Sequence, residues 1–342
     1  MRRLLAVLAA LLPLQAAALD LRRPEVRAFV NEVARRDHLE RRWVARIVAA
    51  AETKSAILVA MNRPAERVLQ WQAYRRIFVS EQRIAAGRAF YAEHRPLLEA
   101  AARTSGVPAE MIAAIIGIET SYGRITGNYR VLDALATLAF DYPERSAYFR
   151  GELEQFLLLS REARFDPLKV TGSYAGAMGA PQFMPGSYRS FARDGDGDGR
   201  IDLWNNWADI FASVAHYFIA HGWHPGEPVA APAELADPDA EDLPANRLEL
   251  HYTLGELRRR GVEFATALPD DASALLVAVR DGDGPRYRVG FHNYWVITRY
   301  NRSVLYALAA CELAAAIGAA DATGATPAAA RPAAAGGGAG GR

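Results

Sequence analysis

A carboxylate within an apolar helical stretch is the feature of this chain best suited to chemistry. Residues 107–122 read VPAEMIAAIIGIETSY, which is typical of an amphipathic helix with Pro108 at its first position, Glu110 in its first turn and a stop at Gly123. Glu119 falls on the apolar face, with the three residues Ile112, Ile115 and Ile116. A carboxylate that loses water has a raised pKa and can carry a proton near neutral pH. The stretch predicts either a catalytic acid or a buried glutamate satisfied by a structural neighbour.

A second cluster of carboxylates lies in the segment DGDGDGRID, residues 194–202. Its aspartates at positions one, three and five, glycine at six and acid at nine match the start of an EF-hand calcium loop. Asn205 occupies position twelve, where a glutamate is usual, so we expect a weak site or a longer loop that Asp209 closes. The alternative is a solvated acidic turn. The predicted ligands of a structural Ca²⁺ are Asp194, Asp196, Asp198, Arg200, Asp202 and Asp209.

Composition restricts the function classes. The chain has 342 residues, 51% of them hydrophobic, which is enough for a large core in one large domain or two to three smaller ones. With 40 basic and 39 acidic residues, it gives no electrostatic reason to expect nucleic acid or an anionic membrane as a partner. The histidines form no HExxH pair, and His221 and His224 flank a Gly-Trp that predicts a loop rather than a zinc site. The single cysteine, Cys311, excludes an internal disulfide and predicts an inert packed thiol.

Both ends of the chain have compositions that predict no part in the fold. Arg2 and Arg3 precede an apolar run over residues 4–14 and three alanines at 16–18, which predicts a signal peptide over residues 1–18. The apolar run is too short for a stable transmembrane helix. No cysteine follows it, so we expect a secreted periplasmic protein that is not lipid-anchored. Residues 319–342 are almost entirely Ala, Gly, Thr and Pro, which predicts a disordered tail.

Between these ends the hydrophobic period is mostly that of a helix. Helical patterns are found at 23–51 (one or two helices), 82–102, 110–122, 131–140, 146–160 and 209–221. Alternation predicts strands at 247–254 and 272–280, the second forming a hairpin with YRVGFHNYWVITRY, residues 287–300, across a DGDG turn at 281–284. The Pro- and acid-rich residues 228–246 are interpreted as a connection. The chain therefore predicts a mainly α fold with a small sheet near the C-terminus.

Four ordered blocks of this sequence resemble lytic murein transglycosylases of the membrane-bound B type. They are IIGIETSYGRITGNYRVLDALATLAFDYPERSAYF, GSYAGAMGAPQFMPGSY, DGDGDGRIDLWNNWADIFASVAHYFIAHGW and ITRYNRSVLYA, and the resemblance extends from Pro24 to Leu313. It implies a lysozyme-like (goose-type) catalytic core with an additional α domain and a small β subdomain. The expected division is an α domain at 19–106, the core at 107–227 with the cation loop at 194–209, the β subdomain at 228–290 and a return to the core at 291–318.

The resemblance also implies an activity and a set of site residues. The family cleaves the β-1,4 bond between N-acetylmuramic acid and N-acetylglucosamine in peptidoglycan without water, leaving a 1,6-anhydro ring, with one glutamate as acid and base. Here that residue is Glu119. Ser173 matches the serine that holds the 2-acetamido group. The other positions expected to bind the substrate are Gln182, Phe183, Tyr217, Asn301, Tyr306, Tyr74 and Arg145. Many members have two arginines where this chain has Glu144 and Arg145, so the resemblance implies one basic contact here, from Arg145.

The residues themselves support a mechanism with a single carboxylate. Ordinary glycoside hydrolysis uses two, but the other candidates, Asp133, Asp141, Glu144 and Glu152, all lie in polar or helix-cap contexts that favour structural roles. Two alternatives stay open at this point. One is a muramidase that hydrolyses the same bond, and the other is a non-catalytic peptidoglycan-binding scaffold organised by calcium. The expected partners are peptidoglycan glycan strands, with other cell-wall enzymes also considered, and the expected state is a monomer that binds no nucleic acid.

Overall fold

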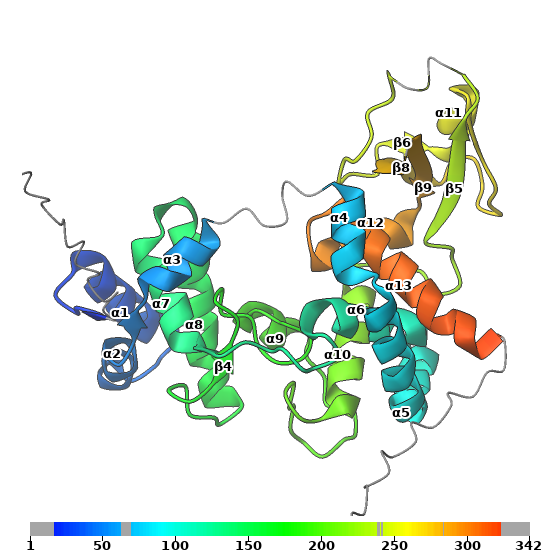
Figure 1. The fold of residues 1–342 in the computed structure, drawn as a ribbon. Coiled ribbons are helices and arrows are strands. Elements are labelled where there is room, and N and C mark those ends of the chain that lie inside the picture. Colours follow the sequence, from blue (N-terminus) through cyan, green and yellow to red (C-terminus); the bar gives the residue numbers. More distant parts are fainter. Residues whose placement is uncertain (1–16, 63–69, 238–239, 241, 283, 323–342) are drawn as a thin grey trace, which may run out of the picture.

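The computed structural model describes residues 17–62, 70–237, 240, 242–282 and 284–322. Most of these residues are helical (Figure 1). The helices of the first half are α1 (Pro24–Arg36), α2 (Arg41–Ala49), α3 (Ser55–Met61), α4 (Trp71–Phe78), α5 (Glu81–Ser105), α6 (Ala109–Thr120), α7 (Val131–Asp141) and α8 (Ser146–Glu162). They are followed by α9 (Pro185–Phe191), α10 (Trp207–Ala220), α11 (Leu254–Arg259), α12 (His292–Tyr300) and α13 (Val304–Ala322), with a 3₁₀ turn, η1, at Pro143–Arg145. Each helical pattern found in the sequence corresponds to a helix, and residues 23–51 form two.

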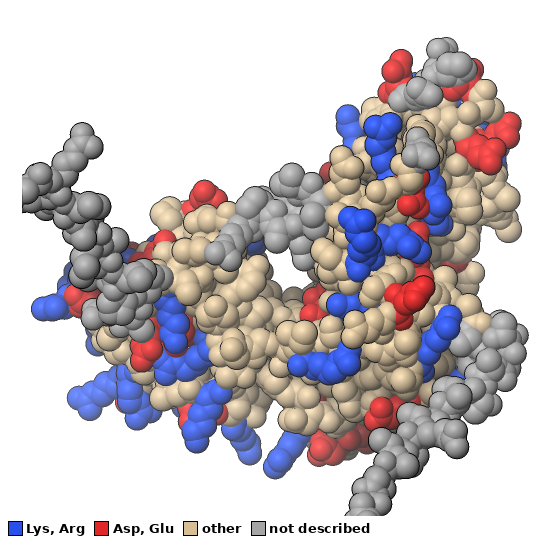
Figure 2. Space-filling view, in the orientation of Figure 1, with Lys and Arg blue, Asp and Glu red and all other residues tan. Residues whose placement is uncertain are grey.

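The helices form two groups joined by one hydrophobic core. Helices α7 and α8 pack on each other, with α3 against α7 and the pair α1 and α2 beside them (Figure 1). In the second group, α6 packs against α5, α10 and α13, and α4 packs against α13. The segment before α6 is therefore shared between the groups, residues 19–62 lying with α7 and residues 70–106 with α6. Figure 2 shows the surface hollowed between the two groups.

Helix α6 lies at the centre of the second group and differs from the amphipathic helix expected from the sequence. Its side chains are buried on nearly all sides, and Ile112, Ile115 and Ile116 have no exposed surface. A helix that is apolar all round is a core helix. Pro108 is the residue before the first helical position rather than that position, and the helix ends at Thr120, followed by a left-handed Ser121, not at Gly123.

The sheet forms a subdomain with its own hydrophobic core at the C-terminal side. Its strand order is β6 (Tyr252–Thr253), β8 (Ser273–Asp281), β9 (Gly284–Gly290), β5 (Ala230–Leu235) and β7 (Val262–Phe264), with antiparallel pairing throughout. The predicted hairpin is confirmed over β8 and β9, which pair from Leu275↔Gly290 to Asp281↔Gly284. Residues 292–300, expected to belong to its second strand, form the helix α12 instead. The short pairs β1 (Ala17–Ala18) with β2 (Glu52–Thr53), and β3 (Tyr129–Arg130) with β4 (Thr171–Gly172), lie among the helices.

Two other expectations for this region were wrong. Residues 228–246, interpreted as a connection, contain β5, which lies between β9 and β7. Pro232 is tolerated there because β7 pairs only from Ala233 onward, so no β7 residue faces the side where the proline lacks its N–H. The strand expected at 247–254 shrinks to Tyr252–Thr253, because Thr253 forms a capping box with Glu256 and starts α11 instead.

The chain ends show a further difference. Residues 1–16 of the predicted signal peptide lie outside the described residues, while Ala17 and Ala18 pair with β2. The tail expected from residue 319 begins too early, because α13 continues to Ala322. Among the described residues, no single helix is long and apolar enough to cross a membrane; the bent pair of α12 and residues 304–319, at 107°, meets that test by length and composition only.

Candidate active site

Glu119 lies in the last turn of α6 and is partly exposed, unlike the buried residues on either side of it. Its carboxylate Oε1 accepts a hydrogen bond of 2.7 Å from the hydroxyl of Tyr306, in α13. Tyr306 is 1% exposed, and burial together with the charge of Glu119 raises its pKa well above the usual value for tyrosine. The hydroxyl therefore keeps its proton and acts as a donor to Glu119 at any physiological pH.

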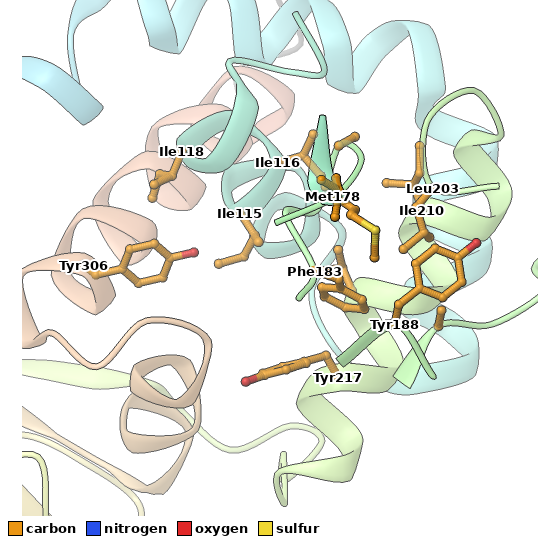
Figure 3. Packing of buried hydrophobic residues seen from close by; sticks show 14 of the residues in the cluster. Ile115, Ile116, Ile118, Met178, Phe183, Tyr188, Leu203, Ile210, Tyr217 and Tyr306 are labelled. Atoms are coloured by element: carbon orange, nitrogen blue, oxygen red, sulfur yellow. The ribbon is translucent and has the colours of Figure 1, made fainter. Parts of the chain in front are cut away.

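Two further tyrosines surround the same carboxylate. Burial raises the pKa of Tyr217 to about 12 and that of Tyr300 well above its usual value, and the charge of Glu119 contributes to both shifts. The ring centroids of Tyr217 and Tyr300 are 4.7 Å apart, and Tyr300 lies nearly parallel to Tyr306 at 6.4 Å. Figure 3 shows Tyr217 and Tyr306 entering one region from different elements, with Ile115 beside them. This aromatic wall suits the apolar face of a sugar ring.

The hydroxyls of these two tyrosines have other partners. That of Tyr217 donates to the carbonyl of Arg299 at 2.7 Å, and that of Tyr300 donates to the carbonyl of Pro181 at 2.7 Å. Each bond fixes a ring against a neighbouring segment. The resemblance implied Tyr217, Asn301 and Tyr306 as site residues but not Tyr300, which directly precedes Asn301. Nothing in the sequence around Tyr300 indicates that it belongs to the site.

Residues 171–184 lie beside the end of α6 that carries Glu119. The hydroxyl of Thr120, next to Glu119, donates to the carbonyl of Ala180 at 2.9 Å and so joins this segment to the helix. The hydroxyl oxygen of Ser173 accepts from the backbone N–H groups of Ala175 and Ala177, at 3.3 and 3.0 Å. Because the oxygen is the acceptor in both bonds, neither bond uses the hydroxyl proton. Ser173 is partly exposed, as a substrate-binding hydroxyl must be.

Gln182 and Phe183 contribute to this segment in different ways. The Gln182 amide nitrogen donates to the carbonyls of Thr126 and Gly179, at 3.1 and 2.9 Å, which leaves its carbonyl oxygen for another donor. Gln182 has a φ of 53°, a left-handed conformation that costs on the order of 1 kcal/mol for a residue other than glycine. Phe183 is only 2% exposed and packs against Tyr217 at 5.6 Å and Tyr300 at 6.0 Å. Its ring supports the tyrosines from behind.

Helix α8 supplies the opposite side of the hollow. The guanidinium of Arg145 lies over the ring of Tyr148 at 4.6 Å, and the Tyr148 side chain is 42% exposed. Tyr148 is hydrogen-bonded to Glu152 and close enough to Tyr217 to influence its pKa. Sequence reasoning missed Tyr148, although its spacing of three residues from Arg145 and four from Glu152 places all three on one helical face.

The remaining predicted positions lie behind or beside this constellation. Tyr74 is 1% exposed in α4 and stacks between Trp71 and Phe78, at 6.5 and 4.7 Å. Its effect on the pKa of Tyr306 shows that the two are close, so it supports Tyr306 from the core. Asn301 caps the end of α12, is partly exposed, and accepts a backbone hydrogen bond from Ser303 at 2.7 Å.

The structure gives each of the other candidate acids a structural partner. Asp133 is buried and is held by Arg130 at 2.5 Å and by Lys54 at 3.3 Å. Asp141 pairs with Arg23 at 2.7 Å, and the exposed Glu144 accepts from Tyr142 at 3.0 Å. Glu152 accepts from the backbone N–H of Gly186, at the start of α9, at 2.8 Å. Burial raises the pKa of Glu152, although that hydrogen bond and the one from Tyr148 oppose the shift.

The acidic loop brings three of the predicted cation ligands together. Carboxylate oxygens of Asp194, Asp196 and Asp209 lie within 4.8 Å of one another, and oxygen donors so arranged fit a hard cation. Asp209 is fully buried and accepts from the backbone N–H groups of Gly195 and Asp202, at 2.8 and 2.7 Å. These two bonds tie Asp209 to both ends of the loop. The carboxylate of Asp202 caps the turn that follows by accepting from Trp204 at 2.8 Å.

Asp198 and Arg200 lie in the exposed part of the loop. A side-chain oxygen of Asp198 accepts from the backbone N–H of Arg200 at 2.8 Å, as successive loop residues coil around the site. Asp194 accepts in the same way from Gly197 and Gly199, and these bonds lower the pKa of its carboxyl. Three of the six predicted ligands are thus adjacent through their side chains, and the others belong to the same turn.

A family model and a known protein match most of this chain. The model of the transglycosylase SLT domain family matches residues 22–315. Membrane-bound lytic murein transglycosylase B of Escherichia coli is 38% identical over 303 residues, which cover 86% of this chain and 82% of that protein.

Solved structures show the same architecture. Catenated lytic transglycosylase SltB1 of Pseudomonas aeruginosa has a TM-score of 0.84 at 48% identity, covering 87% of this chain and 98% of that one. Lytic transglycosylase Slt35 of Escherichia coli, solved in complex with calcium, has a TM-score of 0.81 at 37% identity, covering 90% of this chain and 97% of that one. These neighbours confirm the expected mainly α, lysozyme-like fold. Because the family model covers most of the chain and the relatives share its architecture, the chain belongs to the transglycosylase SLT domain family, and its activity is that of a lytic transglycosylase acting on peptidoglycan.

Proposed function

We propose that Glu119 is the single acid and base of this reaction. The observation that carries the proposal is the hydrogen bond of 2.7 Å between Tyr306 and Glu119 at the edge of the hollow. The other acids that could take part are held by cations, backbone groups or a hydroxyl in structural roles. A hydrolase with two carboxylates would need a second one across the scissile bond from the first. A reaction with one carboxylate fits the residues present.

The proposed reaction has two proton transfers, one from Glu119 to the substrate and one from the substrate back to Glu119. Protonated Glu119 donates to the glycosidic oxygen as the bond from the muramic acid anomeric carbon to that oxygen breaks. The resulting carboxylate then takes the proton of the muramic acid 6-hydroxyl while that oxygen forms a bond to the anomeric carbon. The products are a free sugar 4-hydroxyl and a 1,6-anhydro ring, and Glu119 is protonated again. Tyr306 stabilises the carboxylate that exists between the two transfers.

We propose that Ser173 orients the 2-acetamido group of the muramic acid. Its oxygen already accepts two backbone N–H groups, so its proton is available to the acetamide carbonyl. The aromatic wall of Tyr217, Tyr300 and Tyr306 would line the sugar face, with the carbonyl oxygen of Gln182 and the side chain of Asn301 as polar contacts. Arg145, stacked on Tyr148, would contact the substrate from the α8 side.

The acidic loop is proposed to bind Ca²⁺ as a structural ion. Its support is the convergence of Asp194, Asp196 and Asp209 and the calcium complex of Slt35. The loop leads directly into α10, which carries Tyr217, so the ion would hold that helix end in place. Because Asn205 stands at position twelve, we expect an affinity of about 10⁻⁴–10⁻³ M, as in extracellular modules.

The proposed place of action is the periplasm, reached through the signal peptide at residues 1–18. Its support is the peptidoglycan substrate class together with the charged and apolar pattern at the N-terminus. Fractionation of cells that produce the full chain tests this, with N-terminal sequencing of the mature protein. Recovery of uncleaved protein in the cytoplasm would contradict it.

The role of Glu119 is tested by Glu119→Gln beside Glu110→Gln, which changes a carboxylate in the first turn of the same helix. The amide of the first variant keeps the shape but cannot donate and recover a proton, so we expect its rate to fall by about two to four orders of magnitude. Glu110→Gln should keep the wild-type rate. Retention of about a tenth or more of the activity in Glu119→Gln would overturn the assignment, because the smallest loss expected from general acid–base catalysis is about a hundredfold.

A further inference from the structure

The chain leaves the catalytic helix through three successive left-handed residues. Ser121, Tyr122 and Gly123 have φ values of 51°, 64° and 78°. Glycine adopts this conformation readily, but serine and tyrosine do so only where their surroundings over-determine it. The strained residues follow Glu119 by two and three positions, so whatever holds them also sets the last turn of α6.

The ring of Tyr122 is held against two glycines. It is 7% exposed and covers Gly117 of α6 and Gly87 of α5. A Cβ atom added at Gly117 would lie 2.6 Å from the ring, and one added at Gly87 would lie 2.3 Å from the Tyr122 hydroxyl. Both distances are far below van der Waals contact, so the ring could not stay where it is if either glycine became alanine.

Hydrogen bonds close a loop around the same ring. The Tyr122 hydroxyl donates to the carbonyl of Arg83 at 2.9 Å, and the Arg83 guanidinium donates to the carbonyl of Gly117. The backbone N–H of Tyr122 donates to the carbonyl of Ile116 at 3.2 Å. Arg83 thus reaches the end of α6 from α5 and gives a second donor to the Gly117 carbonyl, which also accepts from the backbone N–H of Ser121 at 3.1 Å. On the other side, Trp207 packs against Gly123.

We propose that Tyr122 is a positioning residue that fixes the direction in which the last turn of α6 presents Glu119. Arg83 holds it, and Gly87 and Gly117 provide the space for its ring. The inference rests on the proposed role of Glu119, because a turn needs this precision only if the carboxylate it carries transfers the proton. A catalytic group misplaced by about 1 Å can cost about a hundredfold in rate.

The test compares kcat and KM of variants on a defined peptidoglycan oligosaccharide. Tyr122→Ala and Gly117→Ala should lower kcat by about ten- to a hundredfold, because Glu119 is displaced. KM should stay within twofold, as the sugar-binding wall is unchanged. Tyr122→Phe keeps the ring and should recover kcat to within about threefold of the wild type, the cost of one hydrogen bond. Gly151→Ala is the matched control in α8, where an added Cβ meets nothing within 4 Å, and should behave as the wild type.

Two further measurements separate this proposal from neighbouring explanations. In a Glu119→Gln background, Tyr122→Ala should cause no further loss of rate, because residues that act as a unit are not additive. If thermal melting shows that Tyr122→Ala or Gly117→Ala does not fold, Arg83→Met is measured instead, because it keeps the Tyr122 ring and leaves α6 unchanged. That variant should lose about tenfold in kcat with KM unchanged.

The outcomes distinguish the two claims. If Glu119→Gln is active, the proposed function fails, whatever Tyr122 does. If Glu119→Gln is inactive but folded Tyr122→Ala or Arg83→Met keeps the wild-type kcat, only the positioning role is overturned. A further drop on adding Tyr122→Ala to Glu119→Gln, or a rise in KM that accounts for the whole loss, would also overturn it.

Discussion

Removing the hydroxyl of Tyr306 tests the immediate environment of the catalytic carboxylate. Tyr306→Phe keeps the buried ring and its near-parallel stacking on Tyr300, but removes the 2.7 Å hydrogen bond to Glu119. A hydrogen bond to a charged group is worth about 1.5–3 kcal/mol. Only the part that is stronger in the transition state than in the ground state affects kcat. The upper limit is therefore a loss of about ten- to a hundredfold, since each 1.4 kcal/mol is a factor of about ten.

The same bond predicts a change in the pH dependence. A hydroxyl that donates to the carboxylate favours its ionised form. Without it the ionised form is less stable, so the limb of the kcat/KM profile that belongs to Glu119 should move to higher pH. The limb that a tyrosine could contribute lies far above the assay range, since burial raises the pKa of Tyr217 to about 12.

The assay is steady-state release of muropeptides across pH, with Tyr252→Phe as the control. This control variant also removes a hydrogen-bonded tyrosine hydroxyl, but one in the β subdomain, where Tyr252 donates to the carbonyl of Pro244 at 3.0 Å. We expect Tyr252→Phe to keep the wild-type kcat and profile. A kcat for Tyr306→Phe within twofold of the wild type with an unmoved profile, or an equal loss in both variants, would refute the reasoning.

Three more outcomes are expected. Ser173→Ala should slow the reaction by about fivefold, the worth of one hydrogen bond of about 1 kcal/mol, and an unchanged rate on a defined oligomer would exclude the acetamide contact. Calcium titration should raise the melting temperature by mass action, and no shift up to millimolar calcium, or the same shift in Asp194→Ala/Asp198→Ala, would show an acidic turn only. Because the folded-state pKa of Glu152 is raised, its contribution to stability is present below its unfolded-state pKa and is lost as pH rises through the folded-state value. Glu152→Gln should therefore gain stability over the wild type as pH rises above about 4, and chemical denaturation showing a gap that shrinks as pH rises would contradict this.

Helices such as α5, α7, α8 and α10 could be predicted because each carries its own periodic signal, whereas α3, α4, α9, α11 and α12 were not predicted. Patterns at 131–140 and 146–160 became α7 and α8 nearly residue for residue. The errors occurred where the packing of distant elements decided the outcome. Residues 230–235 have a Pro- and Ala-rich sequence without a strand signal, and they form β5 only because β9 and β7 supply partners on both sides. Helix α6 looked one-sided in sequence because its neighbours α5, α10 and α13 are not visible there.

The site residues also divide into those that the local sequence indicates and those that depend on the packing of distant elements. Spacing drew attention to Glu119 and its isoleucine neighbours but left a catalytic acid and a structural glutamate both open, and loop chemistry made Asp194 and Asp209 candidate cation ligands. Tyr306 lies 187 residues from Glu119, so the bond between them could be expected only through the family resemblance. The contacts that hold the ring of Tyr122 were not predicted, because its positive φ and its packing against two glycines depend on how α5 packs on α6.

The central claim is that one carboxylate cleaves the glycan while the substrate's own hydroxyl, and not water, closes the ring. It is tested most directly by digesting purified peptidoglycan in water enriched in heavy oxygen and analysing the muropeptide ends by mass spectrometry, with Glu119→Gln in parallel. We predict that the wild type releases ends lighter by one water than hydrolysed ends, that these ends carry no heavy oxygen, and that Glu119→Gln releases almost none of them. Heavy oxygen at the muramic acid end would show hydrolysis, and anhydro ends formed by Glu119→Gln at the wild-type rate would contradict the role of Glu119.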